Sequence, residues 1–144
     1  MRGPTRILTT LVAALLLVLG VIPARADGLG PCDLSRGEGE TVQQLSRRMI
    51  RCATDRWPVN GGAARAICIA DHESGLDPQV TSPGGAYLGL FQQSAAAWPD
   101  RYREWTRPAW DLDESALSAR TNVIVTIRMV YAGGWGPWAG VDGC

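Results

Sequence analysis

Four cysteines place the strongest constraint on the fold of this chain, because they limit which segments can lie side by side. They stand at positions 32, 52, 68 and 144 of its 144 residues. An even number of cysteines in a small exported chain is typical of two disulfides, and four cysteines allow three connectivities. We expect Cys52 to pair with Cys68, since Cys52 belongs to the apolar stripe of a predicted helix, and Cys32 to pair with Cys144, since both lie in flexible ends.

The N-terminal segment predicts that the chain is exported. Arg2 and Arg6 precede an apolar run over residues 7–22, and residues 24–26 read Ala-Arg-Ala, the small-x-small pattern of a signal-peptidase site. We therefore expect a signal peptide over 1–26 and a mature protein that is secreted or lies in the cell envelope. An uncleaved membrane anchor is the alternative, because the run approaches the roughly 17 to 25 residues needed to span a bilayer.

Charge and composition exclude several classes of protein. The leader holds three arginines and no acid, so the mature chain has eleven basic and fourteen acidic residues and is weakly acidic. Nucleic-acid binding is therefore disfavoured, and no membrane contact is expected after signal cleavage. One histidine and the lack of a Cys-x-x-Cys pair argue against zinc, and we expect no metal and no organic cofactor.

Patterns after the leader predict a single, mainly α domain without repeats. Residues 27–40 are rich in glycine and predict a flexible segment, and residues 41–144 form the domain. Thr41 and Gln44 have the spacing of a capping box before a helix over 42–55, and a second helix over 63–74 ends at Gly75.

The second half of the domain alternates irregular and helical segments. Residues 76–89 predict a loop or small β-turn region, and 90–98 a short helix that Pro99 stops. An irregular stretch over 99–111 follows. Asp113 is expected to cap a final helix over 114–131, which has so little polar surface that it should be the buried axis of the fold.

Glu73 has the position of a general acid. The residues three, four and seven before it are Ala70, Ile69 and Ala66, so its carboxyl group stands on an apolar stripe in the last turn of its helix. Burial and the negative end of the helix dipole both disfavour the carboxylate, so we expect a raised pKa. His72 lies about 100° further round the helix and is expected on the surface.

The sequence around Glu73 resembles the soluble lytic transglycosylases and their lysozyme-like relatives. Their pattern is E-S-x-x-x-P-x-V-x-S-P-x-G-A-x-G-L-x-Q, and the chain departs from it where Tyr87-Leu88 occupies the place of one residue. The matching residues are Glu73, Ser74, Pro78, Val80, Ser82, Pro83, Gly85, Ala86, Gly89, Leu90 and Gln92. A looser similarity extends through Asn122-Val123 and Tyr131 to the glycine and tryptophan ending at 133–138, and Gln92, Ser94 and Trp98 are similar to resuscitation-promoting-factor-type muralytic domains.

The resemblance implies a lysozyme-like domain that cleaves peptidoglycan. Glu73 is expected to protonate the β-1,4 bond between N-acetylmuramic acid and N-acetylglucosamine and then to help form a 1,6-anhydromuramoyl end. The protein is expected to be a monomer whose partner is the glycan strand. The candidate substrate-binding residues are the polar Gln92, Tyr87, Asn122, Tyr131 and Ser82 and the aromatic Trp135, Trp98 and Trp138.

Two other functions stay open at this point. A hydrolytic muramidase of the same fold would invert and needs a second carboxylate about 6.5 to 9.5 Å from the first. Asp100, Asp111 and Asp113 are the candidates, although each also suits a turn or cap. A cell-wall-binding protein without catalytic activity is the other alternative.

Overall fold

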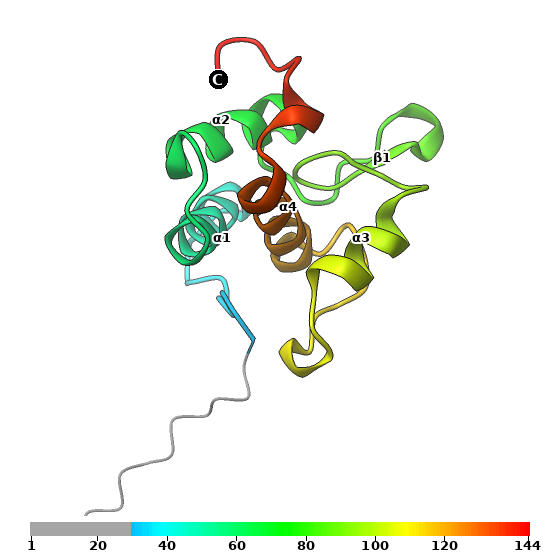
Figure 1. Ribbon diagram of the computed structural model, residues 1–144. Helices are drawn as coiled ribbons and strands as arrows, with labels where there is room; N and C mark the ends of the chain where they lie inside the picture. The colour runs from blue at the N-terminus through cyan, green and yellow to red at the C-terminus, as the bar shows by residue number, and fades with distance from the viewer. Residues whose placement is uncertain (1–29) are drawn as a thin grey trace, which may run out of the picture.

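The computed structural model describes residues 30–144, and the predicted signal peptide lies outside them. The described part is mainly helical, as predicted, with one two-stranded sheet (Figure 1). None of the helices in residues 30–144 is both long and apolar enough to cross a membrane. The elements are α1 (Val42–Arg56), α2 (Gly62–Ser74), η1 (Pro83–Gly85), β1 (Tyr87–Leu88), β2 (Gln93–Ser94), α3 (Trp98–Trp105), η2 (Pro108–Trp110), α4 (Ala119–Gly133) and η3 (Gly136–Trp138).

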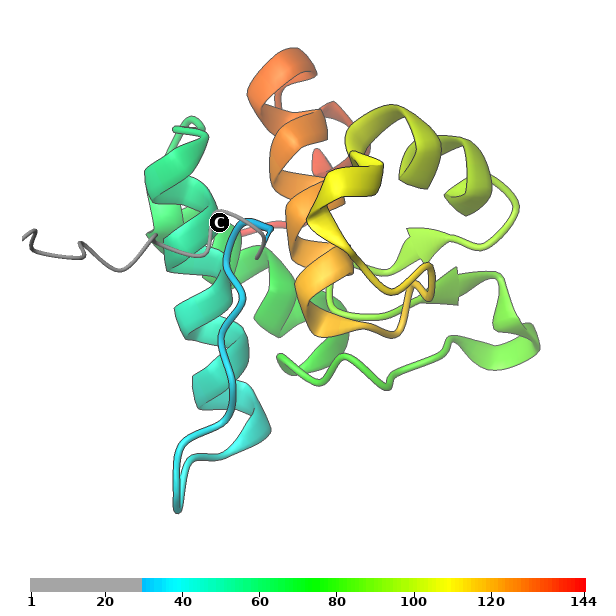
Figure 2. The same cartoon turned by 90° about the horizontal axis from the view of Figure 1, so that it is seen from below.

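Helix α4 is the buried axis of the fold, as its apolar sequence predicts. Eight of its fifteen residues are buried, including an unbroken run from Thr121 to Ile127. Figures 1 and 2 show α4 between α1 on one side and α3 on the other, and both of these helices contact it. The helix therefore joins the two halves of the domain.

The predicted start of α4 is wrong by five residues. The helix begins after Ser118, whose hydroxyl accepts a hydrogen bond from the backbone N–H of Thr121. The Asp113 carboxylate instead accepts from the backbone N–H of Ser115 and caps a turn. Ser118 and Asp113 are both good cap residues, so the sequence alone does not choose between them. In the structure the residues between them are mostly not buried, and the helix does not extend through them.

The predicted helix over 90–98 is also wrong, because Pro99 begins a helix instead of ending one. It occupies the first turn of α3, where the missing N–H of proline costs nothing. The residues before it form β2, which pairs antiparallel with β1 so that Tyr87 faces Ser94. The small β-turn region predicted over 76–89 is confirmed by β1 and by a bridge between Thr81 and Leu88.

The first two helices are confirmed with their predicted caps. The Thr41 hydroxyl accepts from the backbone N–H of Gln44 at 3.2 Å, and the Gln44 side chain accepts from the backbone N–H of Thr41 at 2.8 Å. Gly75 ends α2 in the left-handed conformation, with φ at 61°. These local signals fix both helices where the sequence places them.

Two disulfides are present, but the predicted pairing is wrong. Cys32 is joined to Cys52, and Cys68 is joined to Cys144, with Cα–Cα distances of 5.8 and 5.7 Å. The prediction placed Cys52 on the apolar stripe of α1 that faces the core, whereas Cys52 is only half-buried. The buried residues of this helix are Ser46, Met49, Ile50, Ala53 and Thr54.

The observed pairing follows from where the two ends of the chain run. Figure 2 shows the segment before α1 running back along that helix, which brings Cys32 beside the half-buried Cys52. The last residues lie against α2, where the Gly143 carbonyl is 3.8 Å from the Cys68 sulfur. Each end is therefore tied to the helix that it contacts, and the two ends are not tied to each other.

A cluster of tryptophans surrounds the Arg128 side chain on α4. The guanidinium carbon lies 5.0 Å from the Trp110 ring centre, 5.7 Å from that of Trp57 and 5.9 Å from that of Trp105. The guanidinium also donates to the Trp105 carbonyl. Burial lowers the pKa of Arg128, but an arginine stays charged at neutral pH. The cation therefore links α4 to η2, to the end of α3 and to the residue that follows α1, through aromatic contacts.

Arg128→Met is expected to lower the free energy of unfolding by about 1 to 3 kcal/mol, since it keeps the aliphatic stem and removes the cation–π contacts. Denaturant unfolding of the purified protein measures the loss. Arg103→Met is the matched control, because Arg103 is an exposed arginine that pairs with Asp100 on the surface of α3. Such a pair contributes about 0 to 1 kcal/mol. Equal losses in the two variants would show that the tryptophan cluster does not depend on the cation.

Candidate active site

Glu73 lies in the last turn of α2, at a point where the chain is held to the following loop. The Ser74 hydroxyl is within hydrogen-bond distance of the Ala70 carbonyl at 3.0 Å and of the Leu90 carbonyl at 2.9 Å. Gly75 and Leu76 both have positive φ and turn the chain sharply away from the helix. The end of α2, with Glu73 beside Ser74, is therefore held against the segment that follows the β-turn region.

The carboxyl group of Glu73 is half-buried, and its pKa is raised. Burial is the larger cause, and the nearby His72 opposes it weakly. This direction agrees with the expectation from the apolar stripe on α2. A glutamic acid with a raised pKa keeps its proton to a higher pH than an ordinary one, which favours a general acid. His72 is exposed, as predicted.

A fully buried amide holds the β-turn region against α4. Asn122 Oδ1 accepts from the Phe91 N–H at 3.1 Å, and Nδ2 donates to the Ala116 carbonyl at 2.8 Å and the Leu88 carbonyl at 3.2 Å. Gly89 lies so close that an added Cβ would come within 2.5 Å of this amide nitrogen. The contact explains why glycine stands at position 89, where φ is also positive.

Two residues on and just after the β-turn region, Tyr87 and Gln92, lie near Glu73. The Tyr87 backbone N–H donates to the Ser82 hydroxyl at 2.9 Å, and the Tyr87 side chain is 52% exposed. Gln92 has a φ of 45°, and its amide nitrogen donates to the carbonyls of Gly89 and Val80. The Gln92 amide is thus held by backbone groups. Gln92 itself has a left-handed backbone conformation, which is uncommon for a residue other than glycine, and it lies beside Glu73.

These elements enclose a pocket of about 320 Å³ with Glu73 in its wall. Its lining combines one acidic, one basic, three uncharged polar and two apolar or aromatic side chains. They are Glu73, Arg101, Tyr87, Gln92, Ser94, Pro137 and Trp138. Glu73 is the only carboxylate among these lining residues. A concave site with a few converging polar groups is the form expected of a small-ligand site.

The sequence predicts some of this lining and misses other parts. Glu73, Tyr87 and Gln92 come together as predicted, and Trp138 lies beside them. Arg101 is not indicated by any motif, and Ser94 and Pro137 are indicated only by the looser similarity. Arg101 lies in the segment predicted to be irregular, so its place on α3 beside the pocket could not be foreseen.

Several predicted substrate-binding residues lie outside this lining. Trp135 is buried, donates to the Asn60 carbonyl at 2.8 Å and packs against Phe91. Trp98 is buried in a second core and donates to the Glu114 carbonyl at 2.7 Å. Asn122, Ser82 and the exposed Tyr131 are also outside it, so the structure does not bring these five to the pocket.

The three aspartates considered as a second carboxylate also lie away from this lining. Asp100 pairs with Arg103 on the surface of α3, and Asp113 caps a turn. Asp111 adopts a left-handed conformation, with φ at 48°, at the end of η2. Turn and cap roles therefore account for two of them, and Asp111 occupies a turn position that suits aspartate.

A wider surface depression of about 580 Å³ on α1 has different chemistry. Glu38 and Glu40 lie there with Arg47, Arg48 and Arg51. The Arg48 guanidinium pairs with Glu40 at 2.8 Å and lowers the pKa of that carboxyl, so Glu40 is ionised at neutral pH. An ionised, paired carboxylate cannot serve as a general acid, and Glu73 is the better candidate.

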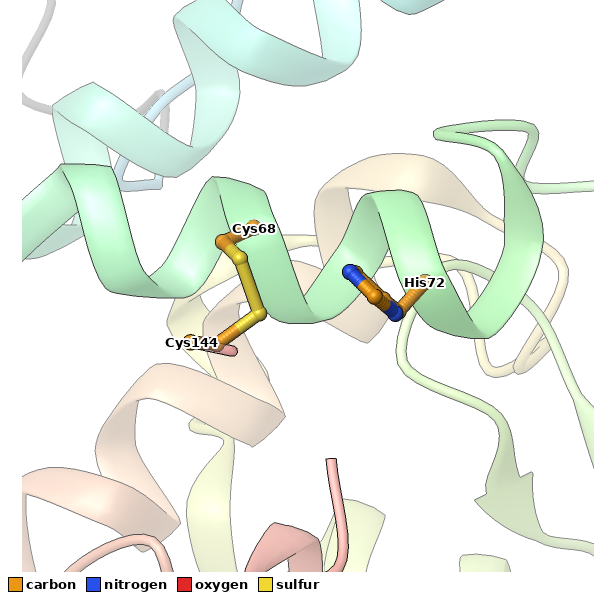
Figure 3. A group of neighbouring side chains, drawn as sticks. All are labelled: Cys68, His72 and Cys144. Carbon is orange, nitrogen blue, oxygen red and sulfur yellow. A yellow bond between two sulfur atoms is a disulfide. The ribbon is translucent and has the colours of Figure 1, made fainter. Parts of the chain in front are cut away.

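Cys68, His72 and Cys144 form the one cluster in residues 30–144 with the spacing of a metal site (Figure 3). Their potential ligand atoms lie within 4.8 Å of one another. Both sulfurs are joined in a disulfide, however, and zinc binds cysteine as the thiolate. The cluster is therefore a disulfide with a neighbouring surface histidine on the next turn of α2.

Comparisons of the chain with protein families, with curated proteins and with solved structures find no match.

Proposed function

We propose that the protein is a lysozyme-like peptidoglycan lytic transglycosylase. It acts on the β-1,4 bond between N-acetylmuramic acid and N-acetylglucosamine, with Glu73 as the general acid and base. The observation that carries the proposal is the half-buried Glu73 carboxyl, with its raised pKa, as the only acidic group lining the pocket. The motif shared with the transglycosylases from Glu73 to Gln92 supports the choice of substrate.

The reaction needs one proton donor and one nucleophile. Protonated Glu73 gives its proton to the glycosidic oxygen, and the bond from that oxygen to the muramoyl C1 breaks. The acetamido oxygen of the muramoyl unit attacks C1 and replaces the leaving group, one of the recognised substrate-assisted routes. Glu73, now a carboxylate, removes the proton of the 6-hydroxyl, whose oxygen displaces the acetamido oxygen and closes the 1,6-anhydro ring. The carboxyl group ends the cycle protonated, as it began.

Other side chains of the pocket suit a glycan substrate. Tyr87 presents an exposed side chain, and the polar residues Gln92 and Ser94 line the same pocket. Trp138 adds an aromatic edge, with its indole N–H already bonded to the Phe91 carbonyl. Aromatic faces flanked by amides and hydroxyls match the apolar faces and hydroxyls of sugars. The two disulfides are compatible with an extracellular protein and so with a cell-wall substrate.

The hydrolytic muramidase is the nearest rival, and the pocket lining disfavours it. An inverting enzyme needs a second carboxylate to activate water on the opposite face of the sugar. Asp100, Asp111 and Asp113 lie outside the lining, which argues against this role for them. A cell-wall-binding protein without turnover is the farther rival, and any bond cleavage by the purified protein excludes it.

Analysis of the reaction products tests the proposal. Digestion of purified peptidoglycan is expected to give 1,6-anhydromuramoyl ends, which are one water lighter by mass than hydrolysis products and resist borohydride reduction. Asn in place of Asp100, Asp111 or Asp113 should leave the product unchanged and lower the rate by no more than a few fold. Reducible muramoyl ends as the main product, or an inactive but folded aspartate variant, would favour the inverting muramidase.

A further inference from the structure

Arg101 supplies the only positive charge in the lining of the Glu73 pocket. It lies in α3, and its side chain is half-buried. No step of the proposed bond cleavage uses it, since the glycan at the scissile bond carries no charge. Its presence therefore needs an explanation of its own.

A buried glutamine, itself bonded to a buried threonine, holds one end of the Arg101 guanidinium. Its Nη1 donates to Gln93 Oε1 at 2.5 Å, and Gln93 Nε2 donates to Thr126 Oγ1 at 2.6 Å. Gln93 on β2 and Thr126 on α4 are both fully buried. A buried polar chain of this kind is tolerated only when its members are satisfied, and it then holds its groups rigidly. The chain thus runs from the central helix to the pocket and orients one cation there.

The charge of Arg101 is not used within the described residues. The arginines that form ion pairs in residues 30–144 are Arg48, Arg103 and Arg120, each with a nearby acid. Arg101 forms none, although it shares a pocket with Glu73. Its Nε and Nη2 groups have no protein acceptor in this part of the chain and yet are not sealed from solvent. A fixed guanidinium with free N–H groups is suited to a planar, bidentate acceptor such as a carboxylate.

We infer that Arg101 forms a carboxylate-binding subsite beside Glu73, which takes an acidic group of the peptide stem on the muramoyl unit. The inference rests on the proposed function and adds that the peptide stem of the substrate decides specificity. The sugar backbone of peptidoglycan is neutral when its lactyl groups carry peptides, so the acidic groups of a strand are the stem carboxylates. Arg101 is therefore a specificity-determining residue that selects strands bearing stems.

Binding of glycan strands to an inert protein tests the subsite independently of turnover. The ligand is soluble, uncrosslinked strands with intact stems, and a second sample has its carboxyl groups capped with methylamine by carbodiimide coupling. The Glu73→Gln protein is expected to bind the native strands about ten-fold more tightly than the capped strands, as one charge-assisted contact allows. The double variant Glu73→Gln, Arg101→Gln should bind both samples with the same, weaker affinity.

Two further variants separate the subsite from a structural role. Arg101→Lys in the Glu73→Gln protein keeps the charge and should restore part of the preference for native strands. Arg103→Gln makes the same change on the exposed side of α3 and should leave the ten-fold preference intact. The inference is overturned if capping still weakens binding ten-fold without Arg101, or if capping does not weaken binding to the Glu73→Gln protein. Failure of the proposed function is a separate result, namely that the wild-type protein does not cleave native strands.

Discussion

Glu73→Gln is expected to lower the rate of peptidoglycan cleavage by about 10³-fold or more, while the protein stays folded. Glutamine keeps the size and polarity of the side chain but has no proton to give to the glycosidic oxygen. Removal of a positioned acid costs about 10² to 10⁴-fold in general, and here the same group also acts as the base of the second step. Because the lining offers no second acid to replace it, the loss should lie in the upper part of this range.

The raised pKa of Glu73 gives this variant a pH signature. Cleavage by the wild-type protein needs the protonated acid, so the rate should fall as pH rises through the pKa of Glu73, which burial raises above the ordinary value of a glutamate. The folded state also binds this proton more tightly than the unfolded state does. Wild-type stability therefore falls as pH rises from the unfolded pKa through the folded pKa. Glutamine does not ionise and so does not lose this stability as pH rises. Glu73→Gln should therefore be at least as stable as the wild type at pH 7.

Cleavage assays and thermal unfolding at pH 4 and pH 7 measure both effects. Glu104→Gln is the matched control, since it makes the same chemical change at an exposed glutamate of α3 outside the pocket. That control should keep the full activity of the wild type and should not be more stable than the wild type at pH 7. A Glu73→Gln protein with activity within ten-fold of the wild type would exclude Glu73 as the general acid.

The sequence predicts the helices whose ends carry local signals. The capping box at Thr41 and the glycine at position 75 act within a few residues of the chain, so α1 and α2 form where expected. Pro99 is ambiguous, because proline both ends a preceding helix and opens a following one. The choice depends on whether the residues before it pair with β1, and that contact is not local.

Disulfide pairing and burial of aromatic rings could not be predicted for a similar reason. The sequence predicts Cys52 on an apolar stripe but does not show which segment lies beside this cysteine, and in the structure it is the N-terminal segment that carries Cys32. Trp135 looks equally suited to a groove or a core until the position of Asn60, which accepts its N–H, is known. The motif predicted that Glu73, Tyr87 and Gln92 lie together, because all three belong to one short segment of the chain.

Asn122 connects the central helix to this segment, and its replacement is expected to have the largest effect on stability. Asn122→Leu has a similar volume but leaves the Phe91 N–H and the Ala116 and Leu88 carbonyls without their partner. Each buried group that loses its only partner costs about 1 to 3 kcal/mol. We expect the free energy of unfolding to fall by about 2 to 5 kcal/mol, measured by denaturant unfolding.

Asn122→Leu should disturb the pocket as well as lower the stability of the fold, because Asn122 holds the segment between Tyr87 and Gln92 in place. Gln79→Leu is the matched control: its amide also donates to a backbone carbonyl, that of Leu117 at 3.1 Å, but the side chain is exposed. Water replaces that bond, so the control should lose less than about 0.5 kcal/mol. If both variants lose the same small amount, the Asn122 amide does not hold the β-turn region. In that case Tyr87 and Gln92 must be positioned by contacts within their own segment, namely those of Ser82, Val80 and Gly89.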